Sequence, residues 1–429
     1  MSFTGDFEQA LNMFFEIWGR FWWVFLPLFL GVVFFEFWLF YLRTMHINKL
    51  KWTMLRVKTP KDILKSPEAM EHIFSAASSI YSHGLKFWEV YWEGQIEDWT
   101  SFELVGYHTG ISFYIRCLEK HRSMYEAAVY AQYPDAEIEV VEDYTTLLPS
   151  VLPNKTYELF GADMVLAAND AYPLRTYKYW EEAEIVRPNN NAKGIDTMAP
   201  LLEVMSKLKE GEIIWLQVLI RMNEATYDNW RKGAEKLRDK LAGRKDAKKT
   251  GWGGDMSEFF SNLLKAPFGD IEWSEAKKEE AVKPSIMSLT AGEQETIKGI
   301  EEKIAKIIFE TDIRWLYIAK KGVFARGTAS GIIGSFRQFS NLNMNGLRMY
   351  KPTLGIARQP FKAQKIYYKK RMLYDYYRLR RYPPHGKFSV MNIEELASVY
   401  HYPSQIVEAP MLRRVEAKKG EAPPSLPIE

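Results

Sequence analysis

The chain has 429 residues, enough for about two or three domains of ordinary size. Its 57 lysine and arginine residues nearly balance 54 aspartate and glutamate residues, so the formal net charge is only +3. This balance excludes a chain that is basic throughout, and any nucleic-acid contact must therefore be local. The single cysteine, Cys117, excludes an intramolecular disulfide framework and a cysteine-rich zinc site.

Residues 21–42 predict a transmembrane helix. The run FWWVFLPLFLGVVFFEFWLFYL is long enough to cross a hydrocarbon core of about 30 Å, and tryptophan and tyrosine rings lie near its ends. Glu36 within it is expected to snorkel or to be protonated, or else to pair with a partner helix. A buried helix of a soluble domain is the alternative for the whole run. A cleaved signal peptide is not expected, because no lysine or arginine precedes Arg20 and no small-residue cleavage site follows.

The charges on either side of this run predict its orientation. Asp6, Glu8 and Glu16 precede it, whereas lysine and arginine residues follow it at positions 43, 49, 51, 56 and 58. Positive charge favours the cytoplasmic side, so we expect a single span with the N-terminus outside and the bulk of the chain in the cytoplasm. Apolar residues at helical spacing within residues 1–20 predict a short extracytoplasmic segment that lies in the membrane interface.

Residues 50–145 predict a ferredoxin-like domain. Their periodicity gives the order strand, helix, strand, strand, helix, strand, which is the split βαβ arrangement. The last corner is the stretch AQYPDAEIEV (131–140), where Pro134 ends a helix and a half-buried strand begins. The predicted buried positions there are Met124, Ala127, Ala128 and Ala131 on the helix and Ala136, Ile138 and Val140 on the strand.

Residues 155–350 predict a second α/β region of a similar kind, whose strand register stays open. A charged, glycine-rich stretch interrupts it, and we expect a mobile linker over about 243–288 because so long a loop does not fit a compact domain. The expected fold class is therefore α+β: an N-terminal transmembrane helix, a ferredoxin-like βαββαβ domain and a second α/β region.

No catalytic, cofactor or metal site is predicted. The stretch nearest to a Walker A motif is GVFARGT (322–328), which lacks the lysine that reaches the β- and γ-phosphates, so nucleotide hydrolysis is not expected. The histidines show no metal-ligand spacing. Asp135, Glu137 and Glu139 alternate along a strand and could in principle hold a divalent cation, but a solvated strand face is the preferred interpretation.

A basic, aromatic-rich segment with a short helix occupies residues 351–403. Between 351 and 381 it contains ten lysine or arginine residues and one acidic residue, with tyrosines interleaved. Single-stranded nucleic acid binding uses this combination of charge and stacking rings, and an anionic lipid or an acidic partner attracts the same charges. A solvated helix face with its tyrosines packed inward is the preferred interpretation. The candidate contacts are Lys369, Lys370, Arg371, Arg378, Arg380 and Arg381.

The C-terminal stretch predicts a capped helix and a tail. Asn392 is placed to cap a short helix with an apolar face. Residues 404–429 are charged and rich in proline, so they cannot build a core of their own. The candidate docking residues are Leu396, Val399 and Tyr400 on the helix and Arg413 and Arg414 in the tail.

Four stretches carry a family resemblance: SPEAMEHIF, FYIRCLEKHRSMYEAAVYAQYPDAEIEV, NIEELASVYHYPS and RVEAKKGEAPPSLPI. Together they resemble the membrane-anchored N-terminal region found with bacterial conjugation-type ATPases, the FtsK/HerA-like motors of type IV secretion and DNA transfer. The similarity runs from about residue 50 to 429, and no catalytic motif is among its landmarks. The chain ends at Glu429, where the P-loop domain of that family would begin.

The resemblance implies a non-catalytic scaffold or coupling component in the bacterial inner membrane. Its implied partners are membrane lipid and a cytoplasmic P-loop ATPase encoded as a separate chain, with nucleic acid and a second copy of the chain left open. The alternative is a membrane-anchored nucleic-acid-binding protein that uses residues 351–381, and a hidden enzyme is a further rival.

Overall fold

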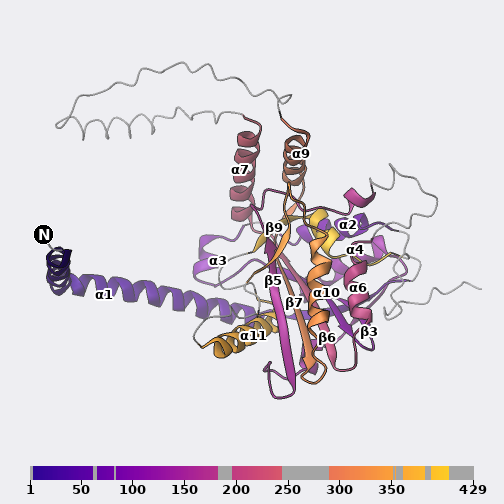
Figure 1. Ribbon diagram of the computed structural model, residues 1–429, viewed down its shortest axis with the longest axis horizontal. Helices are drawn as coiled ribbons and strands as arrows, with labels where there is room; N and C mark the ends of the chain where they lie inside the picture. The colour runs from indigo at the N-terminus through magenta and orange to yellow at the C-terminus, as the bar shows by residue number, and fades with distance from the viewer. Residues whose placement is uncertain are drawn as a thin grey trace, which may run out of the picture.

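The computed structural model describes residues 3–60, 65–81, 84–181, 196–243, 289–350, 353, 361–381 and 388–404. It combines a long N-terminal helix with a domain of helices and antiparallel strands, which confirms the α+β class (Figure 1). Nearly all of the predicted linker and of the tail, including Arg413 and Arg414, lies outside the described residues.

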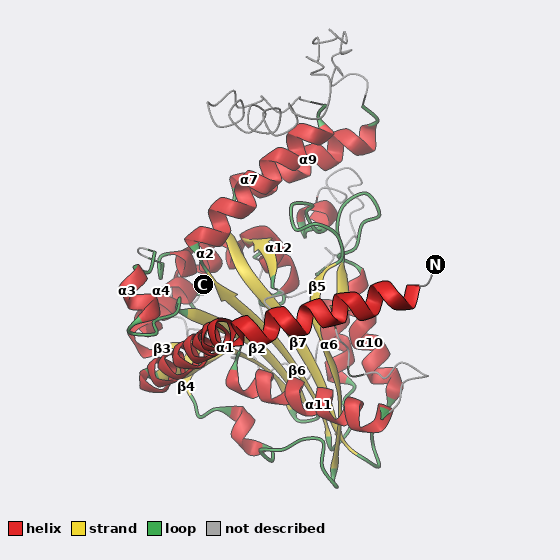
Figure 2. Cartoon of the chain, turned by 90° about the vertical axis from the view of Figure 1, so that its left-hand side faces the viewer, coloured by secondary structure: helices red, strands yellow, loops and turns green. Residues whose placement is uncertain are grey.

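The N-terminal helix α1 (Phe3–Lys49) is continuous, so the predicted interfacial segment and the predicted span belong to one element. Pro27 lies inside it, and proline removes a helical hydrogen bond and promotes a bend. Figures 1 and 2 together show that the N-terminal part of α1 runs across the direction of the part that leads to the sheet. Within the described residues, Leu26–Lys49 is long and apolar enough to cross a membrane.

The strands form an antiparallel sheet in the order β4-β1-β3-β2-β6-β7-β5-β8, with β9 paired to β7. The bounds are β1 Trp52–Lys58, β2 Trp99–Tyr107, β3 Gly110–Leu118, β4 Glu137–Val140, β5 Tyr157–Leu166, β6 Glu212–Arg221, β7 Ile308–Lys320, β8 Leu347–Tyr350 and β9 Ser389–Asn392.

The sheet has two halves with reversed strand orders. In the first half, α2 (Glu68–Ser78) connects β1 to β2 and α4 (Arg122–Gln132) connects β3 to β4. In the second half, α6 (Ala199–Ser206) connects β5 to β6 and α10 (Arg326–Arg337) connects β7 to β8. The halves meet where β2 pairs with β6, from Trp99–Arg221 to Tyr107–Ile213. We call this line the seam, and it makes one continuous sheet of the two predicted regions.

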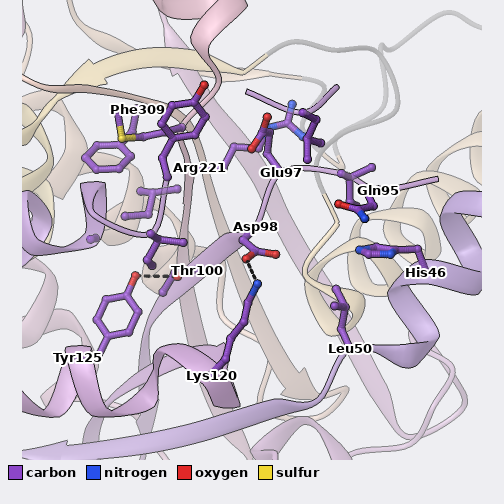
Figure 3. Close-up of a pocket in the computed structure, with 17 residues that line it drawn as sticks. His46, Leu50, Gln95, Glu97, Asp98, Thr100, Lys120, Tyr125, Arg221 and Phe309 are labelled. Atoms are coloured by element: carbon purple, nitrogen blue, oxygen red, sulfur yellow. Dashed lines mark hydrogen bonds and ion pairs between the residues drawn. The ribbon is translucent and has the colours of Figure 1, made fainter. Parts of the chain in front are cut away.

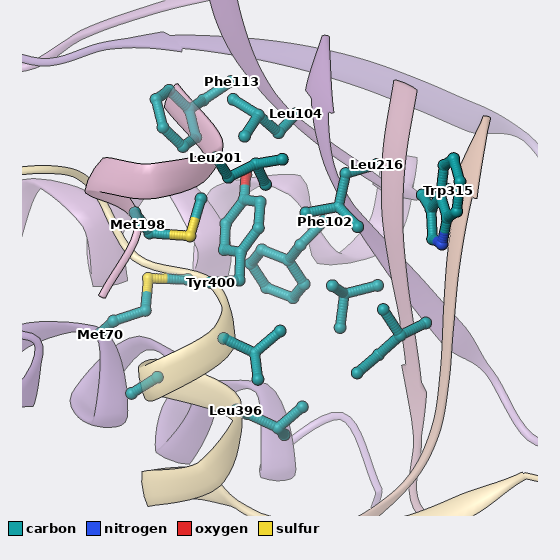
Figure 4. Packing of buried hydrophobic residues seen from close by; sticks show 14 of the residues in the cluster. Met70, Phe102, Leu104, Phe113, Met198, Leu201, Leu216, Trp315, Leu396 and Tyr400 are labelled. Carbon is teal, nitrogen blue, oxygen red and sulfur yellow. The ribbon is translucent and has the colours of Figure 1, made fainter. Parts of the chain in front are cut away.

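Helices cover the two faces of the sheet differently. On one face, side chains from α2, α6, α10 and α12 (Ile393–Val399) share a large core with the strands. Figure 4 shows Tyr400, just after α12, gathered with Met70, Leu201 and Phe102 in this core. On the other face, α11 (Lys362–Leu379) packs tyrosines against Trp215 of β6. Both C-terminal helices therefore contact strands at the seam.

Most of the predicted buried face of α4 is wrong, although Met124 packs against the core. The structure buries Tyr125 and Val129, whereas Ala127 and Ala131 are exposed. The larger side chains take the inward face because the Tyr125 ring packs on Phe102 and its hydroxyl donates to Thr100 Oγ1 at 2.7 Å. The following strand, β4, lies at the edge of the sheet, which leaves Val140 52% exposed.

Three further helices flank the sheet. Helices α7 (Glu224–Leu241) and α9 (Ala291–Ala305) lie in the connection from β6 to β7, pack on one another and project from the domain (Figures 1 and 2). The short helix α3 (Phe87–Tyr91) lies in the connection from α2 to β2, beside the C-terminal part of α1.

Candidate functional site

A cavity of about 250 Å³ lies where α1 meets the sheet. His46 and Leu50, at the end of α1, form part of its wall, and Glu97, Asp98 and Arg221 line it from the sheet side (Figure 3). The cavity thus joins residues from the apolar helix to the ends of β2 and β6. It is a candidate binding or catalytic site, because its lining combines acidic, basic and aromatic side chains.

Of the two carboxyl groups in the cavity, that of Asp98 is hydrogen-bonded and that of Glu97 is desolvated. Burial opposes the charged form of Asp98, but hydrogen bonds from His121 Nε2 at 3.0 Å and Lys120 Nζ at 2.5 Å outweigh it and hold the pKa of Asp98 below its ordinary value. Burial raises the pKa of Glu97 above its ordinary value. Outside the cavity, Cys117 on β3 is buried, and burial raises the pKa of its thiol to about 12. The charged side chains of the cavity thus fit a structural contact between α1 and the sheet better than a catalytic centre.

A second polar cluster is buried beneath α11. Arg380 ends this helix in the left-handed conformation, with φ 48°, and is 1% exposed. Its Nε donates to Glu103 Oε1 at 2.9 Å, its Nη2 donates to Asp143 Oδ1 at 2.9 Å, and its Nη1 also contacts Asp143. The hydroxyl of Tyr144 donates to Glu103 Oε2 at 2.6 Å. Burial opposes ionisation of Glu103, but Arg380 outweighs it and lowers the pKa of that carboxyl.

The cluster continues across the seam into the second half. Gln217 on β6 donates to Glu103 at 3.0 Å and accepts from Arg314 Nη1 at 3.3 Å. Arg314 donates to Asp163 and to Asp312, each at 2.6 Å. Glu103, Gln217, Arg314 and Asp163 are directly opposed partners on neighbouring strands, so they form one row on one face of the sheet.

Asp312 is the member of this cluster whose buried charge is least stabilised by hydrogen bonds and opposite charges. It is fully buried, and its Oδ1 has no hydrogen-bond partner among the described residues. Burial raises its pKa to about 7, although the nearby Arg314 favours the charged form. A buried ionic cluster whose charges are mostly paired favours one arrangement of a sheet, whereas a catalytic site needs access for a substrate. The cover of α11 makes the first role the better fit.

The structure separates the predicted basic contacts. Arg380 is buried in the ionic cluster, so its prediction as a contact for a partner or nucleic acid is wrong. Lys370 pairs with Glu158 at 2.6 Å, and Arg378 Nη1 donates to the Ser150 carbonyl at 2.9 Å. Arg371 and Arg381 are exposed, and Lys369 is half-buried. The segment is thus a helix with an inner structural side and an outer basic side.

The predicted docking face of the C-terminal helix is also wrong. Leu396 and Tyr400 are 0% exposed and Val399 is 2% exposed, because they fill the core between α2, α6 and the sheet. The Tyr400 hydroxyl donates to the carbonyls of Glu103 and Tyr114 at 3.3 and 3.4 Å. The predicted cap is confirmed, since the Asn392 side chain accepts from the Glu395 amide.

The structure also places the stretch nearest to a Walker A motif and the acidic residues considered for a cation. The GVFARGT stretch joins β7 to α10, and the Ala325 amide within it donates to the Tyr317 hydroxyl at 2.9 Å. Among the described residues, no group of histidine, cysteine, aspartate and glutamate side chains could hold a metal ion. Glu137 and Glu139, expected on a solvated strand face, pair with Lys58, and Glu139 also pairs with Arg56.

The buried row was missed by sequence reasoning. Its members stand inside apolar strand runs, as Glu103 does in SFELV and Arg314 in DIRWL. A charge in the middle of such a run signals a buried partner, because an unpaired buried charge is costly. The partners themselves could not be identified, because they come from segments far apart in the chain.

The comparisons with known proteins identify a family. Residues 44–414 match the model of a family described as a domain of unknown function, DUF8128. No curated protein matches the chain. The matched range begins near the end of α1 and includes the whole sheet, α11 and α12. Since the match covers most of the chain, this protein belongs to the DUF8128 family.

Proposed function

We propose that the protein is a non-catalytic, membrane-anchored scaffold. The observation that carries this proposal is the exposure of α1: only 6% of its most apolar window is buried against the rest of the protein. Phe34 and Phe37 are 68% and 69% exposed. Apolar area left in water costs roughly 25 cal/mol per Å², so a helix of this kind needs a lipid or protein cover.

The proposed placement is a single span of the bacterial inner membrane with the N-terminus outside. It rests on the acidic residues before the apolar run and the basic residues after it. A reporter that is active only in the periplasm, fused after Glu429, should stay silent, and a reporter that is active only in the cytoplasm should be active there. The opposite pattern would overturn the orientation, and release of the protein by alkaline carbonate would overturn the span.

The proposed body of the scaffold is a tandem pair of ferredoxin-like units. The order β4-β1-β3-β2 with two crossover helices supports this reading for the first half, and β6-β7-β5-β8 repeats it in the second. The α7–α9 arm is then an insertion between the second and third strands of the second unit. An arm that projects from a rigid sheet is a suitable place for a partner to bind.

The proposed partner is a cytoplasmic P-loop ATPase of the conjugation or type IV secretion kind, an assignment supported by the sequence resemblance alone. The burial of α12 changes the design of the docking test. Ser404 must be kept, because its amide donates to Asp196 Oδ2 at 3.0 Å and its neighbours are in the core. A chain that ends after Ser404 should stay folded and membrane-bound but should lose co-purification with the ATPase.

A narrower test of the same element is the double variant Arg413→Ala, Arg414→Ala in the full chain. If the tail is the docking element, both proteins lose the motor while circular dichroism and membrane fractionation remain unchanged. Retention of the motor at wild-type stoichiometry by the truncated chain would reject tail docking. The α7–α9 arm would then be the next element to test.

A second candidate function is nucleic-acid binding by the outer side of α11. It is favoured by Tyr367 and Tyr368, which are 46% and 67% exposed next to exposed lysine and arginine residues. This function predicts DNA affinity that falls steeply with salt and that weakens when Arg371 is replaced by glutamate. Unchanged affinity in the Arg371→Glu variant would reject it.

A further inference from the structure

Helix α3 packs against α1 within the apolar run itself. The ring of Tyr91 stacks on Phe35, with centroids 5.9 Å apart. Gly94, which follows α3, has φ +69° and lies so close to α1 that a Cβ there would be 2.5 Å from the carbonyl carbon of Leu42. Two contacts therefore fix α3 beside the stretch from Phe35 to Leu42.

This position sets the depth of α3 relative to a membrane. At a rise of about 1.5 Å per residue, the stretch from Phe35 to Leu42 covers about 10 Å of helix. It forms the cytoplasmic end of the predicted span, residues 21–42. The apolar range of the structure extends to Lys49, but Arg43 and Lys49 carry charges that favour the cytoplasmic headgroups, so the hydrocarbon part ends near Leu42. Helices that lie in a membrane interface bury their apolar side by about 5–10 Å, so α3 stands at the depth of such a helix.

The side chains of α3 suit that depth. Phe87, Trp88 and Trp92 are 75%, 57% and 60% exposed, and the rings of Trp88 and Trp92 stack at 4.7 Å. A cluster of large aromatic rings with so much surface free is unusual for a protein face in water. Tryptophan rings favour the boundary between headgroups and acyl chains, where one side of the ring is dry and the other is wet.

Helix α11 lies on the same side of the domain. Figure 2, which looks onto the side from which α1 extends, shows α11 in front of the sheet, and Figure 1 shows α3 and α11 flanking the base of α1. Lys362, Lys365 and Arg371 are exposed on α11. Positive side chains close to the cytoplasmic surface of a membrane attract anionic headgroups.

We propose that α3 and the outer side of α11 form a second membrane contact, beside the span. The rings of Phe87, Trp88 and Trp92 insert into the interface on the cytoplasmic side, and the basic residues of α11 face anionic headgroups. This inference rests on the proposed function, because it takes α1 as the span. It orients the sheet domain on the bilayer instead of leaving it free at the end of a tether.

The test uses the full-length protein in vesicles of phosphatidylglycerol and phosphatidylcholine, with fluorophores at single cysteines. The background is Cys117→Ala, and the labelled variants are Trp88→Cys on α3, Phe34→Cys on α1 and Tyr130→Cys on α4. Tyr130 is the matched control, because it is 42% exposed and Figure 1 shows α4 farther than α3 from the part of α1 that projects from the domain. Lipids that carry a nitroxide quencher near the headgroup or deep in the acyl chain then report depth.

The expected result is stronger quenching at Trp88→Cys by the shallow quencher than by the deep one, with little quenching at Tyr130→Cys. Equal, weak quenching at Trp88→Cys and Tyr130→Cys would overturn the inference. The Phe34→Cys variant separates this failure from failure of the proposed function. Quenching of Phe34→Cys by the deep lipid supports the span, and its absence overturns the span and the inference together.

The part played by α11 has its own readout. A fluorophore at Lys365→Cys should be quenched more by shallow lipid in vesicles that contain phosphatidylglycerol than in vesicles of phosphatidylcholine alone. Equal quenching in both would overturn the assignment of α11 to anionic lipid. Salt-sensitive binding of single-stranded DNA by the detergent-solubilised protein, lost in Lys365→Glu, would also overturn it and would assign the helix to nucleic acid.

Discussion

At the scale of single residues, the unusual feature is a charged row inside a sheet that is otherwise apolar. Glu103 accepts hydrogen bonds from Ser101, Tyr144, Gln217 and Arg380, so its buried charge is fully compensated. The ion pairs need not increase net stability, because desolvation offsets their attraction. Their effect is to make one register of β2 against β6 far better than its neighbours, since a slip would leave these charges unpaired.

Replacement of Arg380 by alanine should be strongly destabilising. It leaves Glu103 and Asp143 without their main cationic partner, and loss of one member of a buried pair costs about 3–5 kcal/mol. Arg371→Ala, on the exposed side of the same helix, should change the free energy of unfolding by no more than about 0.5 kcal/mol. Urea unfolding followed by tryptophan fluorescence compares the two, and similar midpoints would contradict the role of Arg380.

Asp312 predicts a pH dependence of stability with a definite sign. Its pKa is about 7 in the folded protein and 3.8 ordinarily, so the folded protein retains a proton that the unfolded chain releases. The contribution of this group to stability is therefore greatest below about pH 4, is lost as the pH rises to about 7, and changes no further above that.

The variant Asp312→Asn removes the group that binds this proton and keeps an oxygen that can accept a hydrogen bond from Arg314. Its unfolding midpoint should fall less than that of the wild type between about pH 4 and pH 7. Asp135→Asn, at an exposed turn, serves as the control and should follow the wild type. Parallel curves for Asp312→Asn and the wild type would show that Asp312 is ionised in the folded protein throughout.

At the scale of elements, the sequence predicted strands and helices well where one periodicity was clean. The first helix predicted in residues 50–145 is α2, and its Met70, Ile73, Phe74 and Ala77 are buried. Amphipathic patterns did not predict the buried face of a helix where small residues fit either side, as the alanines of α4 do. They also failed for α12, where the apolar face was predicted correctly but its partner was not. An apolar stripe on a helix indicates that this face is buried, but it does not indicate whether the residues that bury it belong to the same chain.

Gly161 should be the most sensitive small residue of β5. A Cβ there would lie 2.4 Å from the Trp315 carbonyl oxygen and 3.1 Å from Leu373 of α11. The backbone atom cannot yield cheaply, so Gly161→Ala should destabilise the protein by about 1–3 kcal/mol and loosen α11 from the sheet. Hydrogen exchange of the α11 amides measures the second effect. Gly327→Ala, where a Cβ would meet nothing within 4 Å, is the control.

At the scale of the whole molecule, the sequence indicated two α/β regions but not that they share a sheet. The order of strands and helices along the first half followed from periodicity, which is a local signal. Pairing of β2 with β6 joins residues more than 100 positions apart, and apolar strands give no local signal of such a neighbour. The cavity at the foot of α1 was invisible for the same reason, since His46, Asp98 and Arg221 come from three separate segments.

The first half alone should fail to form a stable monomer. A chain of residues 44–150 would expose the edge of β2 along its whole length and would bury Glu103 without Arg380. Size-exclusion chromatography with light scattering should find aggregates or oligomers. The control, residues 44–404 without most of α1, should elute as a compact species. A folded monomer of residues 44–150 would contradict the dependence of the halves on one another.

The seam has a consequence for how the protein responds to its own abundance. Antiparallel pairing of equivalent edge strands is the contact by which two identical subunits associate about a two-fold axis. In this chain the two partners are covalently linked, so their pairing does not depend on concentration and dilution cannot separate them. An arrangement that resembles a dimer is thus available to a single molecule at any concentration, and the extra arm α7–α9 makes its two sides unequal.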